Sequence, residues 1–278
     1  MKKINRRSFL AAAGPTAAAL ALTACGGSAS STASSTASSA ASSEAASTSA
    51  AAELTTVEAG KLTMATNAAF PPYEMTTDAG EFEGIDIDTA KAIAEKLGLE
   101  LQIDDMDFDA ALLSVQQGKA DIVMAGVTVT DERKAVMDFS DSYATGIQSI
   151  IVPEGSDITS PDDLAGKKIG TQRGTTGYIY CSDDFGDDAV VAYDDGPTAV
   201  QALNNGQVDA VVIDNAPAKE FVAANPGLVI LDTSYAEEDY AIGLAKGSAL
   251  EDAVNATLEE LKADGTLQSI VDKYITAE

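Results

Sequence analysis

The sequence predicts an α/β fold of two similar lobes with mostly parallel sheets, joined by a two-strand hinge. After Gly60, short runs rich in Val, Ile and Leu alternate with helical patterns, which is typical of α/β folds. One pattern of helix, stopping glycine, acidic residue and buried strand occurs twice, at 112–126 and 199–214. Two further apolar runs, 146–153 and 240–245, flank the second occurrence.

Apolar periodicity defines the elements of the first lobe. Ile87, Ala90 and Ile93 share one face of a helix, and Gly98 is a typical helix stop. The expected order is a strand at 61–66, a helix at 85–98, a strand at 99–103, a helix at 107–118 and a strand at 120–125.

The second lobe repeats this order with a strand ending at Gln172, a helix at 198–206 and a strand at 208–213. We expect the runs 146–153 and 240–245 to pair as crossover strands, with the chain returning to the first lobe through helices at 248–262 and 266–274. The first lobe then holds 57–146 and 240–278, and the second lobe holds 147–239. Two connecting strands between lobes predict closure on a ligand.

The first 24 residues have the features of an export signal, with a basic start followed by a short apolar run. Leu22, Thr23 and Ala24 precede Cys25, as in bacterial lipoproteins whose cysteine is acylated. An ordinary signal peptide is the alternative, and both general secretion and the twin-arginine route remain open. Residues 25–56 are rich in Ser and Ala and predict a flexible tether. We expect an extracytoplasmic protein anchored to the outer face of the cell membrane through acyl chains.

Composition excludes several function classes. The chain carries a net charge of −27, which disfavours nucleic acid and anionic lipid as partners. It contains no histidine, so His-based catalytic triads and His metal sites are excluded. Cys181 alone remains after the anchor, so no intrachain disulfide can form. The run 171–180 lacks the spacing of a P-loop, and 182–188 lacks that of an EF-hand, so we expect no cofactor and no metal.

Polar residues follow the buried strands at the point where each strand ends. Gly126, Thr128 and Arg133 follow the strand at 120–125, and Asp214 ends the strand at 208–213. Because ligands bind outside the carboxyl ends of strands in open α/β sheets, these residues are expected to form the two walls of one cleft. A guanidinium suits a carboxylate and Asp214 suits an ammonium, so together they predict a site for a zwitterionic amino acid. The alternatives are a solvated surface arginine and a helix N-cap role for Asp214.

Aromatic residues at the same strand ends are expected to hold a ligand side chain. Phe70 lies after the first strand, three residues beyond Asn67, and Phe108 lies at the start of the helix predicted at 107–118. Each is also compatible with a place in the core.

Several motifs in order resemble the polar amino-acid substrate-binding proteins of ABC importers. These are the lipoprotein start, T-N-A-A-F-P-P-Y-E, F-E-G-I-D-I-D, D-I-V-M-A-G-V-T-V-T-D-E-R-K, D-F-S-D-S-Y, G-T-Q-R-G-T-T-G and K-A-D-G-T-L. The resemblance covers 58–276 and implies a periplasmic-binding-protein-like fold of two lobes that closes around one amino acid. It also implies delivery of that amino acid to an ABC permease and its ATPase by a monomeric receptor.

The resemblance also implies roles for individual residues. Arg133 corresponds to the arginine that binds the α-carboxylate, with Thr128, the amide of Gly126 and Thr176. Asp214 corresponds to the aspartate that binds the α-ammonium. The aromatic pair and the residues that contact the distal end of the ligand correspond to Phe70, Phe108, Asn67 and Gln172.

The ligand and two other functions remain open at this stage. Relatives for basic or amide ligands often carry an aspartate where this chain has Asn67, which argues against specificity for lysine or arginine and leaves glutamine, other polar amino acids and cystine-like ligands. A few relatives are dehydratases of cyclic prephenate-like acids, in which Glu74 or Asp214 would be a general acid. A ligand-sensing module is the third alternative.

Overall fold

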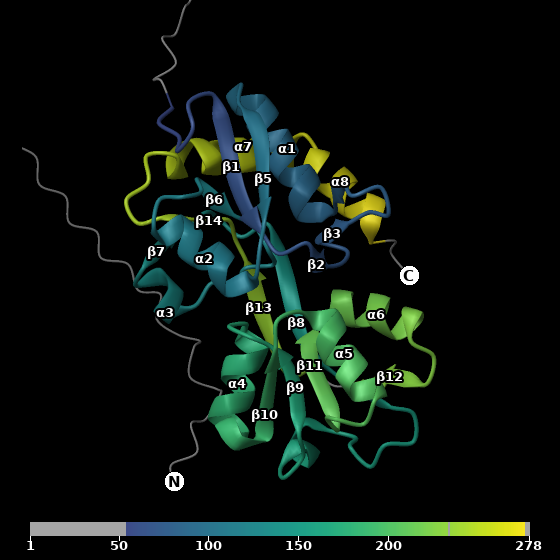
Figure 1. The fold of residues 1–278 in the computed structure, drawn as a ribbon. Coiled ribbons are helices and arrows are strands. Elements are labelled where there is room, and N and C mark those ends of the chain that lie inside the picture. Colours follow the sequence, from purple (N-terminus) through teal and green to yellow (C-terminus); the bar gives the residue numbers. More distant parts are fainter. Residues whose placement is uncertain (1–53, 233, 276–278) are drawn as a thin grey trace, which may run out of the picture. The chain divides into compact units, whose positions relative to one another are not determined.

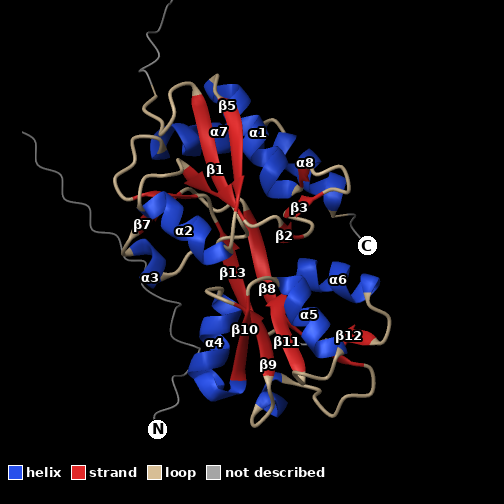
Figure 2. Cartoon of the chain, in the orientation of Figure 1, coloured by secondary structure: helices blue, strands red, loops and turns tan. Residues whose placement is uncertain are grey.

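The structure is a computed structural model that describes residues 54–232 and 234–275 (Figure 1). The predicted signal peptide, its cysteine Cys25 and residues 25–53 of the tether lie outside the described residues. Within the described part, no helix is long and apolar enough to cross a membrane. The described chain forms two α/β lobes, called the first and the second lobe below (Figures 1 and 2).

The first lobe is built on a five-stranded sheet with the order β5-β1-β6-β14-β7. The neighbouring strands β5, β1 and β6 are parallel, and β14 runs antiparallel to both of its neighbours, β6 and β7. The strands are β1 (Lys61–Thr66), β5 (Glu100–Asp105), β6 (Ile122–Val123), β7 (Met137–Phe139) and β14 (Gly243–Ala245). A separate small sheet contains β2 (Ala69–Phe70), β3 (Glu74–Thr76) and β4 (Phe82–Glu83).

Helices cover both faces of the first sheet. Leu62 and Met64 of β1 belong to the apolar cluster that includes the buried side chains of α1 and α7, whereas Ala65 belongs to the cluster formed with α2. This alternation is the period of two expected of a strand buried on both faces. The helices of this lobe are α1 (Ile85–Leu97), α2 (Phe108–Gln116), α3 (Asp131–Lys134), α7 (Glu251–Ala263) and α8 (Thr266–Tyr274).

The second lobe contains a six-stranded sheet with the order β10-β9-β11-β8-β12, in which β13 also pairs with β8. Its three parallel strands are β9 (Ile169–Gln172), β10 (Val190–Tyr193) and β11 (Ala210–Asp214). Its antiparallel strands are β8 (Ala144–Pro153), β12 (Leu228–Ile230) and β13 (Ala236–Tyr240). Its helices are α4 (Thr176–Phe185), α5 (Gly196–Asn204) and α6 (Asn215–Ala224), with short 3₁₀ turns η1 (Pro161–Leu164) and η2 (Asp187–Ala189).

The strand order of each lobe creates a topological switch point at the carboxyl ends of its parallel strands. In the first lobe the chain runs from β1 to β5 and then back past β1 to β6, so the switch lies between the ends of β1 and β6. In the second lobe it lies between the ends of β9 and β11. Ligands of open α/β sheets bind at such points. The residues that follow β1, β6, β9 and β11 are therefore the ones that line the site described below.

The two lobes are connected by β8 and β13, which pair antiparallel over 144–148 and 236–240. The expectation that 146–153 would pair with 240–245 is wrong, because Gly243–Ala245 forms β14 in the sheet of the first lobe. The acidic segment 236–240 takes its place beside β8. Its side chains alternate between exposed and buried, and Glu238 and Tyr240 are the buried ones. An acidic strand of this kind has no apolar run that sequence periodicity would detect.

Glycines end the helices at the positions that the sequence predicts. Gly98 adopts a left-handed conformation with φ 69° directly after α1, and Gly118 has φ 65° shortly after α2. These backbone conformations are favourable for glycine because it has no Cβ atom.

Gly84, which precedes α1, allows this helix to begin directly beside the loop that lines the site. Its φ is +132°, and a Cβ atom at this position would lie 2.1 Å from the carbonyl oxygen of Tyr73. That carbonyl accepts a hydrogen bond from the amide of Asp86 in the first turn of α1. A side chain at residue 84 would therefore disturb both the helix start and the Tyr73–Glu74 segment.

We predict that Gly84→Ala lowers the free energy of unfolding by about 3 kcal/mol, because a strained φ and a steric conflict with backbone act together. Gly98→Ala is the matched control, since its φ is also positive but no atom lies within 4 Å of the added Cβ. The control should cost about 1 kcal/mol. Urea unfolding of both variants measures the difference, and equal losses would contradict the steric argument.

Candidate binding site between the lobes

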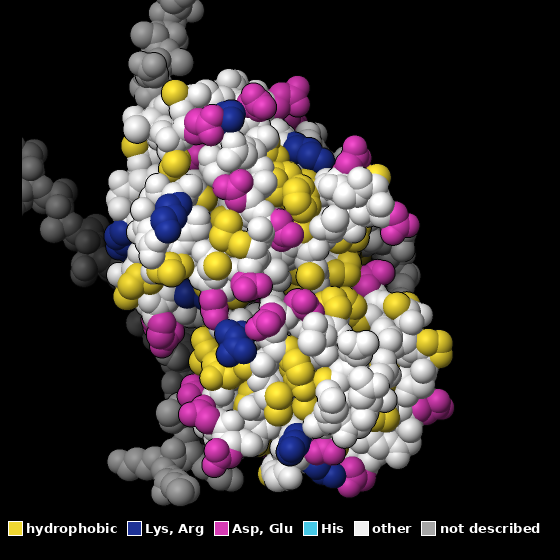
Figure 3. Space-filling model, in the orientation of Figure 1, with side chains coloured by type: hydrophobic (Ala, Val, Ile, Leu, Met, Phe, Trp, Pro, Cys, Tyr) yellow, Lys and Arg dark blue, Asp and Glu magenta, His cyan; other side chains and the backbone are white. Residues whose placement is uncertain are grey.

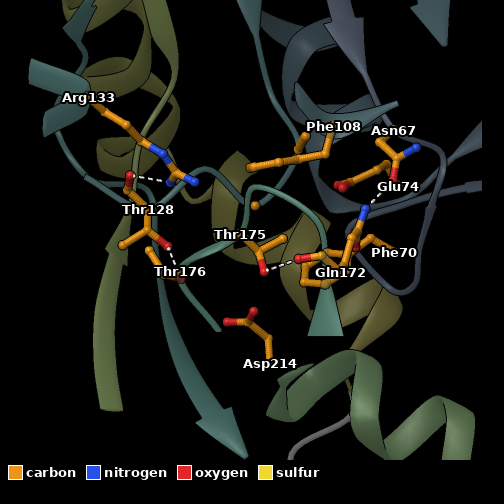
Figure 4. A pocket seen from close by; sticks show the side chains of 12 residues that line it. Asn67, Phe70, Glu74, Phe108, Thr128, Arg133, Gln172, Thr175, Thr176 and Asp214 are labelled. Atoms are coloured by element: carbon orange, nitrogen blue, oxygen red, sulfur yellow. Dashed lines mark hydrogen bonds between the residues drawn. The ribbon is translucent and has the colours of Figure 1, made fainter. Parts of the chain in front are cut away.

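One narrow cavity lies between the carboxyl ends of the two sheets (Figure 4). All nine ligand-binding residues predicted from the sequence line it, namely Asn67, Phe70, Phe108, Gly126, Thr128, Arg133, Gln172, Thr176 and Asp214. Three further residues line it as well, namely Glu74, Ala125 and Thr175.

Arg133 reaches the cavity from the short helix α3. The hydroxyl of Thr130 caps this helix by accepting a hydrogen bond from the Arg133 amide at 3.2 Å. The guanidinium donates through Nη1 to the carbonyl of Thr128 at 2.7 Å and through Nη2 to that of Gly174 at 3.1 Å. It also lies over the ring of Phe108, 5.3 Å from the centroid. These contacts hold the guanidinium in one orientation, so it is not a solvated surface cation.

The charge of Arg133 is buried, since only 8 % of the residue is exposed. Burial lowers the pKa of Arg133, and the negative charge of Glu238 is the largest opposing influence. Among the described residues, no carboxylate forms an ion pair with it. A guanidinium has five N–H donors and two are used by backbone carbonyls, so donors remain for an anion.

Two backbone amides add to this donor set. The bonds Val129 N–H to Asp239 O and Ala241 N–H to Val127 O flank Thr128, so its own N–H and C=O point away from Tyr240. Its carbonyl faces Arg133, and the N–H of an extended residue points to the same side. Thr176 is the first residue of α4, where helix amides lack intrahelical acceptors. Together with Arg133, these amides form a cradle for a carboxylate.

Gly126 lines the cavity, but its amide is already used. It donates to Oδ2 of Asp86 at 3.0 Å, and the hydroxyl of Tyr143 donates to the same oxygen at 2.8 Å. With φ 55° and Phe70 only 2.8 Å from where a Cβ would stand, Gly126 lets the Phe70 ring approach the strand end. In this structure its contribution is therefore space, and the amide of Thr128 is the free donor.

Asp214 lies at the end of β11 with its carboxylate buried. Oδ2 accepts from Nε2 of Gln148 at 2.8 Å, and Oδ1 accepts from the hydroxyl of Tyr240. Although Asp214 occupies the N-cap position of α6, its side chain makes no capping hydrogen bond. The N-cap alternative is therefore not what orients this side chain.

Burial is the main cause that raises the pKa of Asp214, to about 7. The nearby charge of Glu238 raises it further, and the hydrogen bonds from Tyr240 and Gln148 oppose the shift. A cation next to Asp214 would reverse this shift, because an opposite charge favours the ionised carboxylate.

Asn67 and Gln172 form a bridge between the lobes at another part of the cavity. Nε2 of Gln172 donates to Oδ1 of Asn67 at 2.8 Å, and Nδ2 of Asn67 donates to the carbonyl of Met106 at 2.9 Å. Phe70 lies nearby and stacks on Tyr73 with the ring centroids 6.0 Å apart. Amide groups and an aromatic face suit a polar side chain with an aliphatic stem.

Glu74 is a cavity residue that the sequence suggested only as a general acid. Its side chain is fully buried and lies beside Asn67 in the cavity wall (Figure 4). Burial first, and then the charge of Asp86, raise the pKa of Glu74 well above its usual range. Burial also raises the pKa of Asp86, to about 6. A neutral Glu74 explains how two buried carboxyl groups can lie close together.

The sequence signal that could have found Glu74 is its place in the same loop as Asn67 and Phe70. Glu238 had no such signal, because it lies in the acidic segment 236–240, which the sequence analysis did not identify as a connecting strand.

Acidic side chains are common on the visible surface, where they outnumber Lys and Arg (Figure 3). Among the residues that the structure describes, no group of three or more His, Cys, Asp or Glu is placed to hold a metal ion.

Comparison with known proteins identifies relatives along most of the chain. A probable histidine-binding protein of Neisseria gonorrhoeae is 32% identical over 99% of this chain and 98% of its own length. The L-cystine-binding protein TcyJ of Escherichia coli K12 is 33% identical over 80% of this chain and 85% of its own. The solved structure of an ancestral arginine-binding protein bound to glutamine matches with a TM-score of 0.75 and 42% identity. That match covers 78% of this chain and 99% of the ancestral protein.

These similarities agree with the two-lobed α/β fold. The family model of bacterial extracellular solute-binding proteins, family 3, matches residues 62–277, which include both lobes and every residue that lines the cavity. The chain therefore belongs to the bacterial extracellular solute-binding proteins of family 3.

Proposed function

We propose that this protein is an extracytoplasmic receptor that binds a polar L-amino acid between its lobes and delivers it to an ABC importer. The observation that carries the proposal is the placement of a buried arginine and a buried aspartate in one cavity, Arg133 from the first lobe and Asp214 from the second. Arg133 has no carboxylate partner among the described residues, and burial raises the pKa of Asp214, so a bound zwitterion would favour the charged form of both. The relatives support this, since they are named as binding proteins for amino acids.

The α-carboxylate binds to Arg133 and to the amides of Thr128 and Thr176. The guanidinium and the Thr128 amide come from the first lobe, and the Thr176 amide comes from the second. A carboxylate held by both lobes stabilises their closed arrangement. The α-ammonium binds Asp214, which becomes fully ionised on binding.

The ligand side chain lies between Phe70 and Phe108 and reaches Asn67, Gln172 and Glu74. Amides can bind either an amide or a guanidinium, and Glu74 can accept a cation after losing its proton. We therefore infer a polar amino acid whose side chain ends in hydrogen-bond donors, with L-glutamine and L-arginine as the first candidates. The relatives support this breadth, since one arginine-binding protein is solved with glutamine.

We also propose a lipid anchor at Cys25, followed by a flexible tether over 25–56. The boundaries between the lobes are proposed to lie at 146/147 and 239/240. Acyl chains would hold the receptor at the outer face of the cell membrane, and the tether would let it reach its permease. We propose a monomer that closes and opens with ligand and has no catalytic activity of its own.

A thermal-shift screen of the twenty amino acids tests the proposed function. A ligand at a hundred times its dissociation constant should add about 2.7 kcal/mol of stability to the wild-type chain. Arg133→Ala should lose about 2 to 5 kcal/mol of binding free energy to the ligand found, because a buried charged partner is removed. Lys134→Ala, which removes the exposed cation next in the chain, is the control and should bind normally. A wild-type chain that no amino acid stabilises would refute the function.

We predict that the affinity for L-glutamine falls by nearly tenfold for each pH unit below about 7. The pKa of Asp214 is raised to about 7, so binding of the ammonium at lower pH must first release a proton from this carboxyl. Isothermal titration calorimetry at pH 5.5 and 7.5, in two buffers of different ionisation enthalpy, measures both the affinity and the released proton. An affinity that is equal at both pH values would contradict the role of Asp214.

We predict that Glu74→Gln weakens L-arginine binding by about 1.5 to 3 kcal/mol and leaves L-glutamine binding nearly unchanged. The substitution keeps a neutral, hydrogen-bonding side chain of the same size but cannot ionise to meet a guanidinium. Glu81→Gln, which neutralises an exposed glutamate near the same loop, is the control. Calorimetric titration of both ligands gives the ratio, and equal losses for the two ligands would place the cationic group elsewhere.

A further inference from the structure

Glu238 on the connecting strand β13 lies directly behind the carboxylate cradle. Its side chain is only 6 % exposed, and its backbone pairs with Gly146 of β8. It does not line the cavity. Its neighbours along the strand, Glu237 and Asp239, are exposed, so Glu238 is the acidic residue of this strand that faces inward.

One oxygen of Glu238, Oε2, accepts hydrogen bonds from both lobes. The hydroxyl of Thr128 in the first lobe donates to it at 3.1 Å. The hydroxyl of Thr176 in the second lobe donates at 3.0 Å, and Nε2 of Gln148 on β8 donates at 3.0 Å. A single buried carboxylate therefore joins the first lobe, the second lobe and the connecting strands.

The hydroxyl protons of Thr128 and Thr176 are consequently directed away from the cavity. A threonine hydroxyl has one proton, and in both residues it is given to Glu238. The two hydroxyl oxygens lie 3.5 Å apart, and both are closer to Oε2 of Glu238 than to each other. The backbone amides of the two threonines remain free to meet an anion. The side chains thus bind to Glu238 while the backbones face the cavity.

Glu238 also lies near the buried guanidinium of Arg133. Of the charges near the buried guanidinium of Arg133, that of Glu238 contributes most to keeping it protonated. The hydrogen bonds from the threonines and Gln148 are of the charge-assisted kind, about twice as strong as neutral ones. Movement of Thr176 away from β13 would break the hydrogen bond between Thr176 and Glu238.

We propose that Glu238 is a positioning residue that latches the closed arrangement, by binding the hydroxyl of one threonine from each lobe and thereby presenting both threonine amides to the ligand carboxylate. The inference rests on the proposed function, because a slower release of the amino acid is what the latch produces. Glu238 acts through Thr128 and Thr176 and does not touch the ligand.

A double-mutant cycle tests the latch with L-glutamine and L-arginine as probes. Glu238→Gln keeps the size of the side chain and removes its charge, and Thr176→Val and Thr128→Val remove a hydroxyl but keep the amide. Each single variant should weaken binding about tenfold through faster dissociation, with the association rate nearly unchanged. In the Glu238→Gln background, Thr176→Val should cause little further loss. Glu237→Gln, exposed on the same strand, should bind as the wild type does.

Three outcomes would overturn the latch. Losses that multiply in the double variant would show that the hydroxyls contact the ligand directly. A tighter affinity of Glu238→Gln would show that Glu238 competes with the ligand carboxylate for the hydroxyls. A change in the association rate alone would show a long-range charge effect.

The same cycle measured by urea unfolding without any amino acid separates this inference from the proposed function. In one outcome, substitutions at residues 238 and 176 are coupled in the free energy of unfolding, but the wild-type chain binds no amino acid. The hydrogen bonds would then exist, and the receptor function would fail. Binding by the wild type without coupling in affinity would mean that the receptor function holds and the latch fails. Affinities are compared only among variants that unfold cooperatively in urea. If Thr176→Val does not, Thr128→Val takes its place in the cycle.

Discussion

The arrangement of the site depends on one constraint, the burial of the Arg133 guanidinium at the end of a strand. A buried cation without a carboxylate partner is unfavourable unless its donors are satisfied. Two backbone carbonyls, one from each lobe, satisfy part of them, and the ring of Phe108 covers one face. The remaining donors, with the amides beside them, define a position for an anion. In the second lobe, the corresponding strand end carries the opposite charge, because Asp214 is the last residue of β11.

The strand ends explain why so much of the site could be predicted from the sequence. Arg133 and Asp214 each follow a buried run and a helix that ends in glycine, and parallel sheets bring such positions to one edge. The helix with Gly98 as its stop is confirmed for the same reason, since its apolar face has a clear period. Hydrophobic periodicity therefore determined both the fold class and the walls of the cavity.

The connecting strand β13 could not be predicted in the same way. Its residues are mostly acidic, and its inward positions hold Glu238 and Tyr240, which both take part in buried hydrogen bonds. The run 240–245 was predicted as the connecting strand because it is more apolar, yet its residues 243–245 form β14 in the sheet of the first lobe. Glu74 was underestimated for a related reason. Its neutral state arises from burial beside Asp86, which only the three-dimensional arrangement reveals.

The connecting strands have a consequence for how this family can diversify. Gln148 on β8 contacts Asp214, and Glu238 on β13 contacts the threonines, so the zwitterion end of the cavity is supported by the strands on which both lobes turn. Asn67 and Gln172, which we propose contact the ligand side chain, make hydrogen bonds elsewhere, to the carbonyls of Met106 and Asp194. If the protein binds an amino acid as we propose, the residues for the common part of the ligand are supported separately from those for its variable part. New ligand preferences can arise by exchange of the second set while the framework of the first is kept.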